Sequence, residues 1–499
     1  MIDVVSVNEM RMMDMKKCSE VSSLFLMYSA ALKIHDSFKW YGKILIVCGS
    51  GNNGGDGYAL ASLLKADGFD VNILITSNKM SESGKYYYDI CLKNNINIIR
   101  YNDDYIIEGY DIIVDCIFGT GFNGNVSGIY YDIINKINDA KSYVISVDIN
   151  SGLNGDTGMT NCAVKSDITY SIGTFKTGHF LNMAKDYIKK LENLDIDIPL
   201  LNTPYYLLEA SDLKNILRER PNFSNKGDFG YVGLIGGSLE YSGAIRLALM
   251  GTISITSGAG VAICATIKSA ANIVANNILE ATIYPFDDND GDIIFDKEKI
   301  DYLMKRCKVI TFGMGIKVSN GASKILEYLI RNYDKKLVID ADGLNMLSKM
   351  KELLEISKAK IVLTPHLKEF SRLIERDIEN IYENEIEYAM EFAKNYNVVL
   401  LLKGPSTLIT DGIDLIIVDK GCSGMATAGS GDVLSGIITG LLGYNDNVLL
   451  ATASSSYING LAGEIAQSEK SSITMTSKDT VNNVSKAIEI IINDNKEMV

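Results

Sequence analysis

The sequence predicts an α/β protein with parallel sheets, and three observations lead to this fold class. Short apolar runs rich in β-branched residues recur along the chain, each with the length of a buried strand. Segments with helical periodicity separate them, and such an alternation gives a parallel sheet covered by helices on both faces. The chain has 499 residues, which is too long for one ordinary core. We therefore expect more than one domain.

The first half of the chain shows the alternation clearly. Residues 6–40 are expected to form one or two amphipathic helices, with Asn8 to Met10 as a helix start. Further helices are expected at residues 57–67 and 129–138. The apolar runs that we expect as strands lie at residues 43–48, 70–76, 96–100, 111–118, 142–150 and 167–172.

The alternation lapses over residues 191–221, which hold Pro199, Pro204 and Pro221, half of the six prolines. We place a domain boundary near Ala210, which gives domains of residues 1–210 and 211–499. A fresh alternation follows the boundary. Its expected strands lie at residues 231–236, 260–265, 309–313, 336–340, 360–364 and 398–403, and its helices at residues 243–257, 431–442 and 447–466.

Composition excludes several classes of protein. The 48 basic residues against 62 acidic ones give a net charge of −14 without a basic cluster, which argues against nucleic acid as a partner. The eight cysteines are scattered without a CxxC pair, as expected for reduced thiols rather than a zinc or disulfide framework. No secretory signal and no apolar run of membrane-spanning length is present. We expect a soluble cytoplasmic protein with no membrane partner.

The most informative segment is GSGNNGGDG at residues 49–57, between an apolar strand and a helix. Its glycines let the backbone turn tightly and let a ligand come close. The N-terminus of the following helix offers N–H groups and a positive dipole end to a phosphate. A simple turn would not need Asn52, Asn53 and Asp56, whose oxygens suit a cation or a ribose and dihydropyridine ligand. We interpret the segment as a ligand site.

Three further strand ends carry polar signals: Asp115 within residues 114–121, Asp148 and Ser151 within residues 146–152, and Lys176 within residues 173–178. Ligands bind at the carboxyl ends of the strands in an open parallel sheet. Each signal alone is compatible with a loop and a capping aspartate. Four on the same edge favour a site.

The second half has its own glycine-rich loop, AGSGD at residues 428–432, which opens a helix. Its N–H groups form an anion hole, and Asp432 stands where a proton must leave a hydroxyl that attacks phosphorus. The alternative is a helix cap by Ser430, with Asp432 favouring the dipole. Other short motifs occupy residues 224–230, 236–238, 241–244, 313–315, 340–342, 364–370 and 403–407.

Together these motifs resemble known families. Residues 49–57 resemble the N-terminal signature of the NAD(P)H-hydrate epimerase family, and residues 424–436 resemble the nucleotide loop of the ADP-dependent NAD(P)H-hydrate dehydratases. The other motifs of the second half follow in the order of the dehydratase family, which belongs to the ribokinase-like superfamily. The resemblance implies an α/β chain with a Rossmann-like domain over residues 1–210 and a ribokinase-like domain over residues 211–499.

The resemblance also implies an activity. The first domain would interconvert the R and S hydrates of NADH and NADPH, called NADHX and NADPHX. The second would dehydrate the S form with ADP, giving AMP and phosphate. Potassium would serve the epimerase domain and Mg²⁺ would accompany ADP. We expect a homo-oligomer.

Site residues follow from the same resemblance. In the first domain, Asp148 would work as an acid–base catalyst at C6 of the nicotinamide ring, Lys176 would supply charge, and potassium would bind Asn53, Asp115 and Ser151. The residues expected to hold the dinucleotide there are Asn52, Asn53, Gly54, Gly55, Asp56, Gly119, Thr120, Gly121, Phe122, Asn123, Gly124 and Asn125. In the second domain, the hydrate would meet Ala244, Gly315, His366 and the catalytic base Asp432, and the adenine nucleotide would meet Lys403, Gly404, Pro405, Ser406, Thr407 and Gly431.

Some positions depart from the family pattern. Residues 28–31 read Tyr-Ser-Ala-Ala where the family has Glu-Asn-Ala-Gly, and Asn150 stands in place of proline. Ala428, Ser430 and Asn459 replace glycine, threonine and histidine. Two alternatives stay open: a dehydratase whose N-terminal half is a non-catalytic scaffold, and a small-molecule kinase, which a stable phosphorylated product would reveal.

Overall fold

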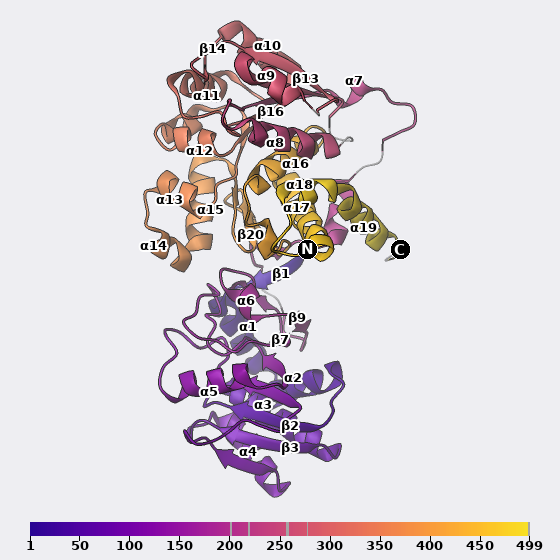
Figure 1. The fold of residues 1–499 in the computed structure, drawn as a ribbon. Coiled ribbons are helices and arrows are strands. Elements are labelled where there is room, and N and C mark those ends of the chain that lie inside the picture. Colours follow the sequence, from indigo (N-terminus) through magenta and orange to yellow (C-terminus); the bar gives the residue numbers. More distant parts are fainter. Residues whose placement is uncertain (200–201, 218–219, 256–258, 277, 498–499) are drawn as a thin grey trace. The chain divides into compact units, whose positions relative to one another are not determined.

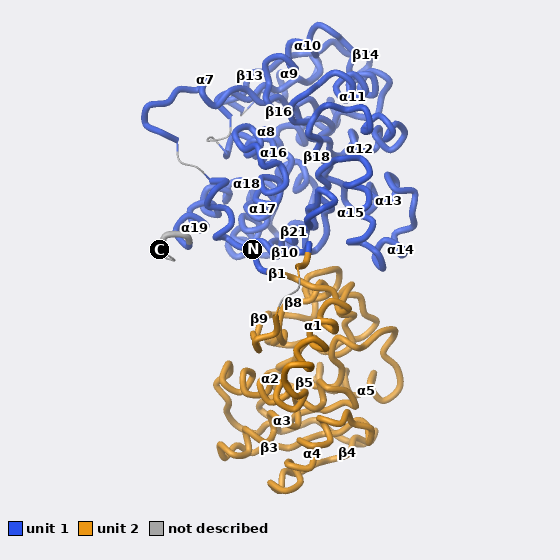
Figure 2. The backbone as a smooth tube through the Cα atoms, turned by 180° about the vertical axis from the view of Figure 1, so that it is seen from behind, with its two compact units in different colours: residues 1–2, 204–499 blue, residues 3–203 orange. Residues whose placement is uncertain are grey.

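The structure is a computed structural model that describes residues 1–199, 202–217, 220–255, 259–276 and 278–497. It divides into two compact units, residues 3–203 and residues 1–2 with 204–499 (Figure 2). We call them the N-terminal and the C-terminal unit. The division lies upstream of Ala210 because β10 (Tyr205–Leu207) pairs in parallel with β21 (Leu415–Val418) and so belongs to the C-terminal unit.

The N-terminal unit contains a seven-stranded sheet in the order β4-β3-β2-β5-β6-β7-β9, and all neighbouring strands are parallel (Figure 1). The chain winds outward from β2 in one direction and from β5 in the other, so the order reverses between these two strands. Six of the strands match the predicted runs, and β9 was not predicted. The strands are β2 (Lys43–Cys48), β3 (Asp70–Ile75), β4 (Asn97–Arg100), β5 (Ile112–Cys116), β6 (Tyr143–Val147), β7 (Ile168–Ile172) and β9 (Leu191–Leu194).

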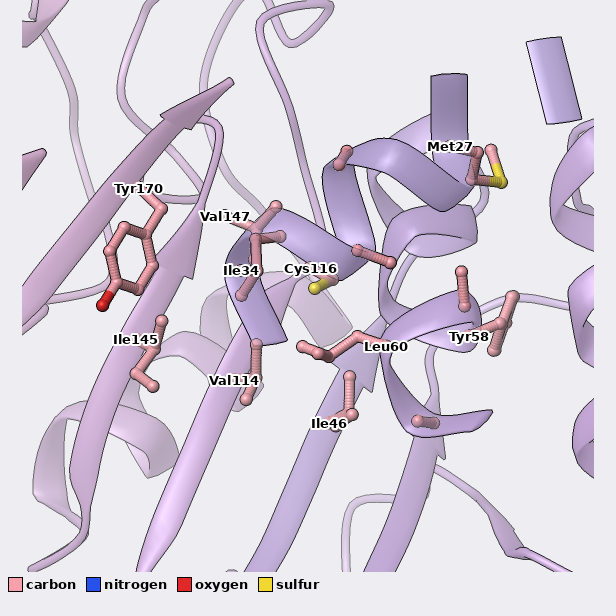
Figure 3. Packing of buried hydrophobic residues seen from close by; sticks show 14 of the residues in the cluster. Met27, Ile34, Ile46, Tyr58, Leu60, Val114, Cys116, Ile145, Val147 and Tyr170 are labelled. Atoms are coloured by element: carbon pink, nitrogen blue, oxygen red, sulfur yellow. The ribbon is translucent and has the colours of Figure 1, made fainter. Parts of the chain in front are cut away.

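Helices cover both faces of this sheet, because successive strand residues point to opposite faces and both sets are apolar. On one face, Ile46 and Val114 pack with Tyr58 and Leu60 of α3 and with Ile34 of α2 (Figure 3). The other face packs against α5 through a separate apolar cluster. The helices of this unit are α1 (Val7–Glu20), α2 (Ser23–Ser37), α3 (Asn52–Ala66), α4 (Glu82–Lys93), α5 (Ile129–Asp139) and α6 (Ala184–Tyr187).

Two helices begin earlier than the sequence indicated. The start predicted at Asn8 to Met10 lies inside α1, which Ser6 caps in a reciprocal pair of hydrogen bonds with Glu9. The helix predicted from Gly57 begins at Asn52, inside the glycine-rich segment. Glycine permits this close approach to the sheet, because a Cβ at Gly54 would lie 2.3 Å from the carbonyl oxygen of Gly49. The segment is therefore the first turn of α3 as well as a loop.

The C-terminal unit is built on one larger sheet. Its strands run in the order β13-β12-β11-β16-β17-β18-β19-β20-β21-β10 (Figure 1). They are parallel from β13 to β19 and antiparallel at the β19/β20 and β20/β21 pairs. The sequence had not predicted β10, β13, β20 and β21. The strands are β11 (Tyr231–Ile235), β12 (Val261–Ile267), β13 (Ala281–Phe286), β16 (Cys307–Phe312), β17 (Lys336–Ile339), β18 (Lys360–Leu363), β19 (Val399–Leu402), β20 (Thr407–Thr410) and β21.

Three helices of this unit position the second site. They are α8 (Ser242–Ser254), α16 (Ser430–Leu442) and α17 (Val448–Lys470), and α16 contacts both of the others. The helix predicted at residues 243–257 corresponds to α8, and its residues 256 and 257 lie outside the described residues. The remaining helices are α7 (Lys226–Phe229), α9 (Lys268–Ala275), α10 (Lys297–Arg306), α11 (Asn320–Asn332), α12 (Asp342–Leu347), α13 (Leu367–Ile374), α14 (Ile378–Glu383), α15 (Glu385–Tyr396), α18 (Ser477–Asn482) and α19 (Val484–Glu497).

In the described residues we find no helix whose length and apolar character would let it span a bilayer.

Candidate functional site

A cavity of about 650 Å³ opens in the N-terminal unit at the carboxyl ends of β2 and β5, where the strand order reverses. This volume falls in the range of small-molecule sites, and the reversal point is where open α/β sheets bind ligands. Many of the predicted residues line it: Asn52, Asn53, Asp56, Gly119, Thr120, Gly121, Phe122, Asn123, Asp148 and Lys176. Gly54, Gly55, Gly124, Asn125, Asp115 and Ser151 are not in its lining.

Asp148 forms the main ion pair of the cavity. Its Oδ1 accepts a hydrogen bond of 2.6 Å from Lys176 Nζ, and its Oδ2 accepts one of 3.3 Å from the Thr120 N–H. Burial opposes ionisation, but the neighbouring Lys176 holds the pKa of Asp148 below its ordinary value. Asp148 also has a φ of +69°, which is uncommon for a residue other than glycine. The structure thus holds an ionised carboxylate at one fixed point of the cavity wall.

His179, which was not predicted from the sequence, bonds to the backbone of both residues of this ion pair. Burial and the charge of Lys176 lower the pKa of His179 to about 4, so the ring is neutral near pH 7. Its Nδ1 accepts a hydrogen bond from the Lys176 N–H, which leaves Nε2 to donate to the Asp148 carbonyl oxygen at 2.8 Å. The histidine therefore ties together the two backbone segments that carry the ion pair.

The three residues expected to bind potassium lie close together: Asn53 lines the cavity, and Asp115 and Ser151 are just outside its lining. Asn53 donates from Nδ2 to the carbonyl oxygens of Phe118 and Val147, at 2.8 and 3.1 Å. The Ser151 hydroxyl donates to Asp115 at 2.5 Å and accepts from the Phe118 N–H at 2.8 Å. Burial raises the pKa of Asp115 above its ordinary value, although hydrogen bonds from Ser151 oppose the shift.

One oxygen of this cluster is left without a partner. Asn53 Oδ1 is buried and has no hydrogen-bond partner in the described part of the chain. An unsatisfied buried oxygen costs roughly 1–3 kcal/mol unless something binds it. Amide, hydroxyl and carboxylate oxygens suit a hard cation, so the donor set fits potassium.

The first two helices supply cavity residues that the sequence did not reveal. Met10, Arg11, Asp14 and Cys18 of α1 line the cavity. Asp14 follows Met10 and Arg11 by four and three residues and Cys18 follows Asp14 by four, which places them on one helix face. A Cβ at Gly121 would lie 3.8 Å from Arg11 Nη2, so the guanidinium adjoins the loop expected to hold the dinucleotide. The helical periodicity was visible in the sequence, but the direction of this face was not.

The residues of this unit that depart from the family pattern, residues 28–31 and Asn150, add no polar group to the cavity wall. Tyr28 and Ser29 lie outside its lining, whereas Ala30 contributes to it. Asn150 is fully buried outside the lining, where its Nδ2 donates to the Val164 carbonyl oxygen at 2.8 Å. Its Oδ1 accepts from the Thr169 hydroxyl at 2.5 Å. Asn150 therefore anchors the surrounding loops.

A second constellation surrounds the N-terminus of α16 in the C-terminal unit. Gly429 precedes the helix with a φ of +93°, and Asp432 stands in its first turn. A Cβ at Gly431 would lie 3.4 Å from Lys403 Nζ, so the lysine reaches the end of the helix. Burial and the neighbouring Asp340 raise the pKa of Asp432 to about 7, although Lys403 opposes the shift. The site thus offers a carboxylate that titrates near neutrality.

His366 and Glu369 form the adjoining wall. His366 caps α13, because its Nδ1 accepts from the Glu369 N–H at 3.2 Å while the Glu369 carboxylate accepts from the His366 N–H at 2.9 Å. Nε2 takes no part in the cap, and half of the His366 side chain is exposed. Burial and Lys403 lower the pKa of His366, so the ring is neutral. His366 can therefore cap α13 through Nδ1 and still present Nε2 to a ligand.

The other predicted residues of this unit lie on nearby segments. Lys403 to Ser406 connect β19 to β20, whose first residue is Thr407, and the Ser406 hydroxyl donates to Asp419 at 2.9 Å. Gly315 has a φ of +63°, and a Cβ there would lie 3.0 Å from the Ala244 side chain. Two residues after Gly315, the Lys317 N–H donates a hydrogen bond to Asp342. The negative charge of Asp342 contributes to the raised pKa of Asp432.

Comparisons with known proteins agree with this two-site arrangement. The model of the NAD(P)H-hydrate dehydratase family matches residues 232–486, and the model of the YjeF-related protein N-terminus matches residues 23–178. The bifunctional NAD(P)H-hydrate repair enzyme Nnr of Dictyoglomus turgidum is 32% identical over 468 residues, which cover 90% of each chain.

Two solved structures resemble the fold. One is a ribokinase-like superfamily protein from Enterococcus faecalis, with a TM-score of 0.50 and 24% identity over 59% of this chain and 98% of that chain. The other is the ADP/ATP-dependent NAD(P)H-hydrate dehydratase of Bacillus subtilis, co-crystallised with ATP and Mg²⁺, with a TM-score of 0.50 and 23% identity over 57% of this chain and 98% of that chain. These two structures show the fold of the C-terminal part, and the sequence matches show that the chain belongs to the family of bifunctional NAD(P)H-hydrate repair enzymes.

Proposed function

We propose that this chain repairs hydrated nicotinamide cofactors. The N-terminal unit would interconvert the R and S hydrates of NADH and NADPH, and the C-terminal unit would dehydrate the S hydrate with ADP. The observation that carries the proposal is the presence of two separate sites in one chain, each at the place where its fold binds ligands. The similarity to a bifunctional repair enzyme over 90% of the chain supports the same pairing.

The dehydration is best explained as phosphorylation followed by elimination. Hydroxide is a poor leaving group, so the β-phosphoryl group of ADP is first transferred to the C6 oxygen, which gives AMP. Asp432 accepts the hydroxyl proton, and the N–H groups at the start of α16 stabilise the phosphoryl group. Phosphate then leaves C6 as the ring nitrogen donates electrons, and loss of a proton from C5 restores the double bond. A base with a pKa of about 7 is suited to this work at neutral pH.

We assign the nucleotide side to Lys403, Gly404, Pro405, Ser406, Thr407 and Gly431, and the hydrate side to Ala244, Gly315, His366 and Asp432. The proximity of Lys403 to Gly431 supports a phosphate between them. Bound Mg²⁺ would reduce the negative charge of the phosphates. The B. subtilis dehydratase was crystallised with ATP and Mg²⁺, which supports this choice of metal.

For the epimerase site, we assign the dinucleotide to Asn52–Asp56 and Gly119–Asn125. Asp148 takes the acid–base role at C6, beside Lys176. Asn53, Asp115 and Ser151 would hold potassium, and the unpartnered Asn53 Oδ1 supports such a cation. The Arg11 guanidinium beside Gly121 adds a positive charge for the dinucleotide phosphates.

The scaffold alternative rested on Tyr28, Ser29 and Asn150. None of these side chains lines the cavity, which supports an active epimerase site over the scaffold alternative. We further propose that the chain works in the cytoplasm as a homo-oligomer. The net charge of −14 supports a role without nucleic acid.

The test is to incubate mixed R and S hydrates with ADP and follow the absorbance of regenerated dihydronicotinamide. We expect complete recovery. A halt after the S fraction would show a dehydratase without an epimerase. Accumulation of a stable phosphorylated product would show a kinase.

A further inference from the structure

Asp14 is a cavity residue to which nothing above gives a role. It lies on α1 and lines the same cavity as Asp148 and Lys176, which come from the segment after β6 and from β8 (Phe175–Lys176). Three carboxylates, those of Asp14, Asp56 and Asp148, therefore reach one cavity from different elements. The helix α1 does not use Asp14 as a cap, because Ser6 and Glu9 cap its N-terminus.

The carboxylate of Asp14 has no structural task. Asp148 is bound to Lys176, and Asp115 is bound to Ser146 and Ser151. In contrast, no hydrogen bond or ion pair joins Asp14 to any residue that the structure describes. A partly buried carboxyl group without a partner reduces stability, and such groups occur where a ligand uses them.

The charges around Asp14 separate its proton affinity from that of Asp148. Burial raises the pKa of Asp14 to about 6, with a further rise from Asp148 and a lowering by Lys176. The pKa of Asp148 is instead held below its ordinary value. Near neutral pH, Asp14 can therefore carry a proton while Asp148 is ionised, which is the typical division between an acid and a base. The charged and titratable groups around Asp14 are Arg11 and Cys18 on its own helix, Asp56 on α3, Asp148 and Lys176.

Epimerisation at C6 needs two such groups. The ring nitrogen can expel the C6 hydroxyl as water if an acid supplies a proton, which leaves a carbon–nitrogen double bond. A water molecule then adds to the other face and loses its proton to a base, so that water and protons balance. The reverse reaction exchanges the two roles. A single carboxylate serves one face only, whereas two carboxylates from different elements can serve both.

We propose that Asp14 is the second acid–base catalytic residue of the epimerase site, acting on the C6 oxygen together with Asp148. The proposal rests on the proposed epimerase function. Asp14 in its protonated form delivers the proton to the departing hydroxyl in one direction. In the other direction its carboxylate accepts the proton of the incoming water.

The experiment uses the full chain without ADP and follows conversion of purified R hydrate into S hydrate by chromatography, with spontaneous conversion subtracted. We expect Asp14→Asn to lower kcat by about 100-fold or more, with KM of the same order as wild type. The wild-type rate should fall as the pH rises through about 6, because Asp14 then loses the proton that it donates. Asp14→Asn should lack this pH dependence, and Asp14→Glu should retain it. Incorporation of ¹⁸O from labelled water into the hydrate should fall in parallel in Asp14→Asn.

Two controls separate catalysis from folding. Glu20→Gln removes a carboxylate from the same helix that is paired with Lys17 and lies outside the cavity lining, so it should behave as wild type. Dehydration of S hydrate with ADP takes place in the other unit and should be unchanged in every variant.

Three results would overturn the proposal. An Asp14→Asn variant that epimerises within a few-fold of wild type would remove Asp14 from the mechanism and leave the epimerase function intact. Loss of the pH dependence in Asp56→Asn but not in Asp14→Asn would transfer the role to Asp56. A wild-type chain without epimerase activity would overturn the epimerase function itself, and this inference with it.

Discussion

Lys403 Nζ lies 3.2 Å from Asp340 Oδ1 at the N-terminus of α16, while the other oxygen of Asp340 accepts a hydrogen bond of 2.7 Å from Ser435. Asp340 is almost completely buried. One lysine thus faces two carboxylates, Asp340 and Asp432, and is bound to the first. Burial and the charge of Asp340 raise the pKa of Asp432 to about 7, as suits a base that must accept a proton near neutral pH.

Replacing Asp432 with asparagine should abolish dehydration while ADP still binds. The amide keeps the shape of the side chain but cannot accept the hydroxyl proton, and loss of a positioned base costs about 10²–10⁴ in rate. Single-turnover kinetics with S hydrate would measure the loss, and calorimetry would measure ADP binding. Activity within a few-fold of wild type would exclude Asp432 as the base.

The pH dependence of dehydration should reflect the same group. Asp432 works as a base only when ionised, so kcat/KM for S hydrate should rise with pH and level off above about 7. Asp340→Asn removes a negative neighbour and leaves Lys403 free to face Asp432. Both changes favour ionisation, so the rise should move to lower pH. A profile that moves to higher pH, or does not move, would contradict this account.

Lys403→Ala should weaken ADP binding and leave the epimerase unchanged. The lysine is expected to meet a nucleotide phosphate next to Gly431, and the epimerase cavity lies in the other unit. Calorimetry with ADP, alongside R-to-S conversion without ADP, would check both halves of the statement. Unchanged ADP affinity would count against the assignment.

Potassium should bind at Asn53, Asp115 and Ser151. The cation would supply the missing partner of Asn53 Oδ1 and assist binding of the dinucleotide phosphates. A high-resolution crystal structure in potassium buffer should show the ion within reach of that oxygen. A water molecule alone at this position would refute the prediction.

Asp148→Ala in the intact chain should leave the R hydrate unconverted, apart from slow spontaneous epimerisation, while the S hydrate is still consumed. The substitution removes the ionised carboxylate and leaves Lys176 buried without its 2.6 Å partner. Circular dichroism should accompany the assay, because an unpaired buried charge also destabilises the fold. If the variant clears both hydrates as fast as wild type, Asp148 has no catalytic role.

The strand ends could be predicted from the sequence because their information is local. An apolar run followed by glycine and a polar residue specifies both a buried strand and the edge where it ends. This is why Asn53, Asp148 and Lys176 were placed at one edge before the fold was known, and why the cavity lies there.

The contributions of α1 and of His179 depend on tertiary packing, which a local pattern does not contain. Asp14 lies on a helix whose periodicity is readable, but the packing of α1 decides which of its faces meets the cavity. The strands β20 and β21 were not predicted because they form an antiparallel hairpin around the polar turn at Asp411 to Asp414, which an alternation of strands and helices does not indicate. Their pairing, of β20 with β19 and of β21 with β20, is what distinguishes them from loops.

The packing of α8 against α16 limits how the C-terminal site can open. A Cβ at Gly436 would lie 2.0 Å from the Ala248 carbonyl oxygen, and Thr252 donates a hydrogen bond of 3.0 Å to the Gly436 carbonyl oxygen. Helices in such close contact move as one rigid body. Because α8 carries Ala244 and α16 carries Asp432, we expect this wall to keep its shape throughout the reaction cycle. Entry of the hydrate and release of AMP therefore depend on movement of the facing segments, the turn at residues 403–407 and the loop at residues 313–317, which should exchange their amide hydrogens faster than the two helices.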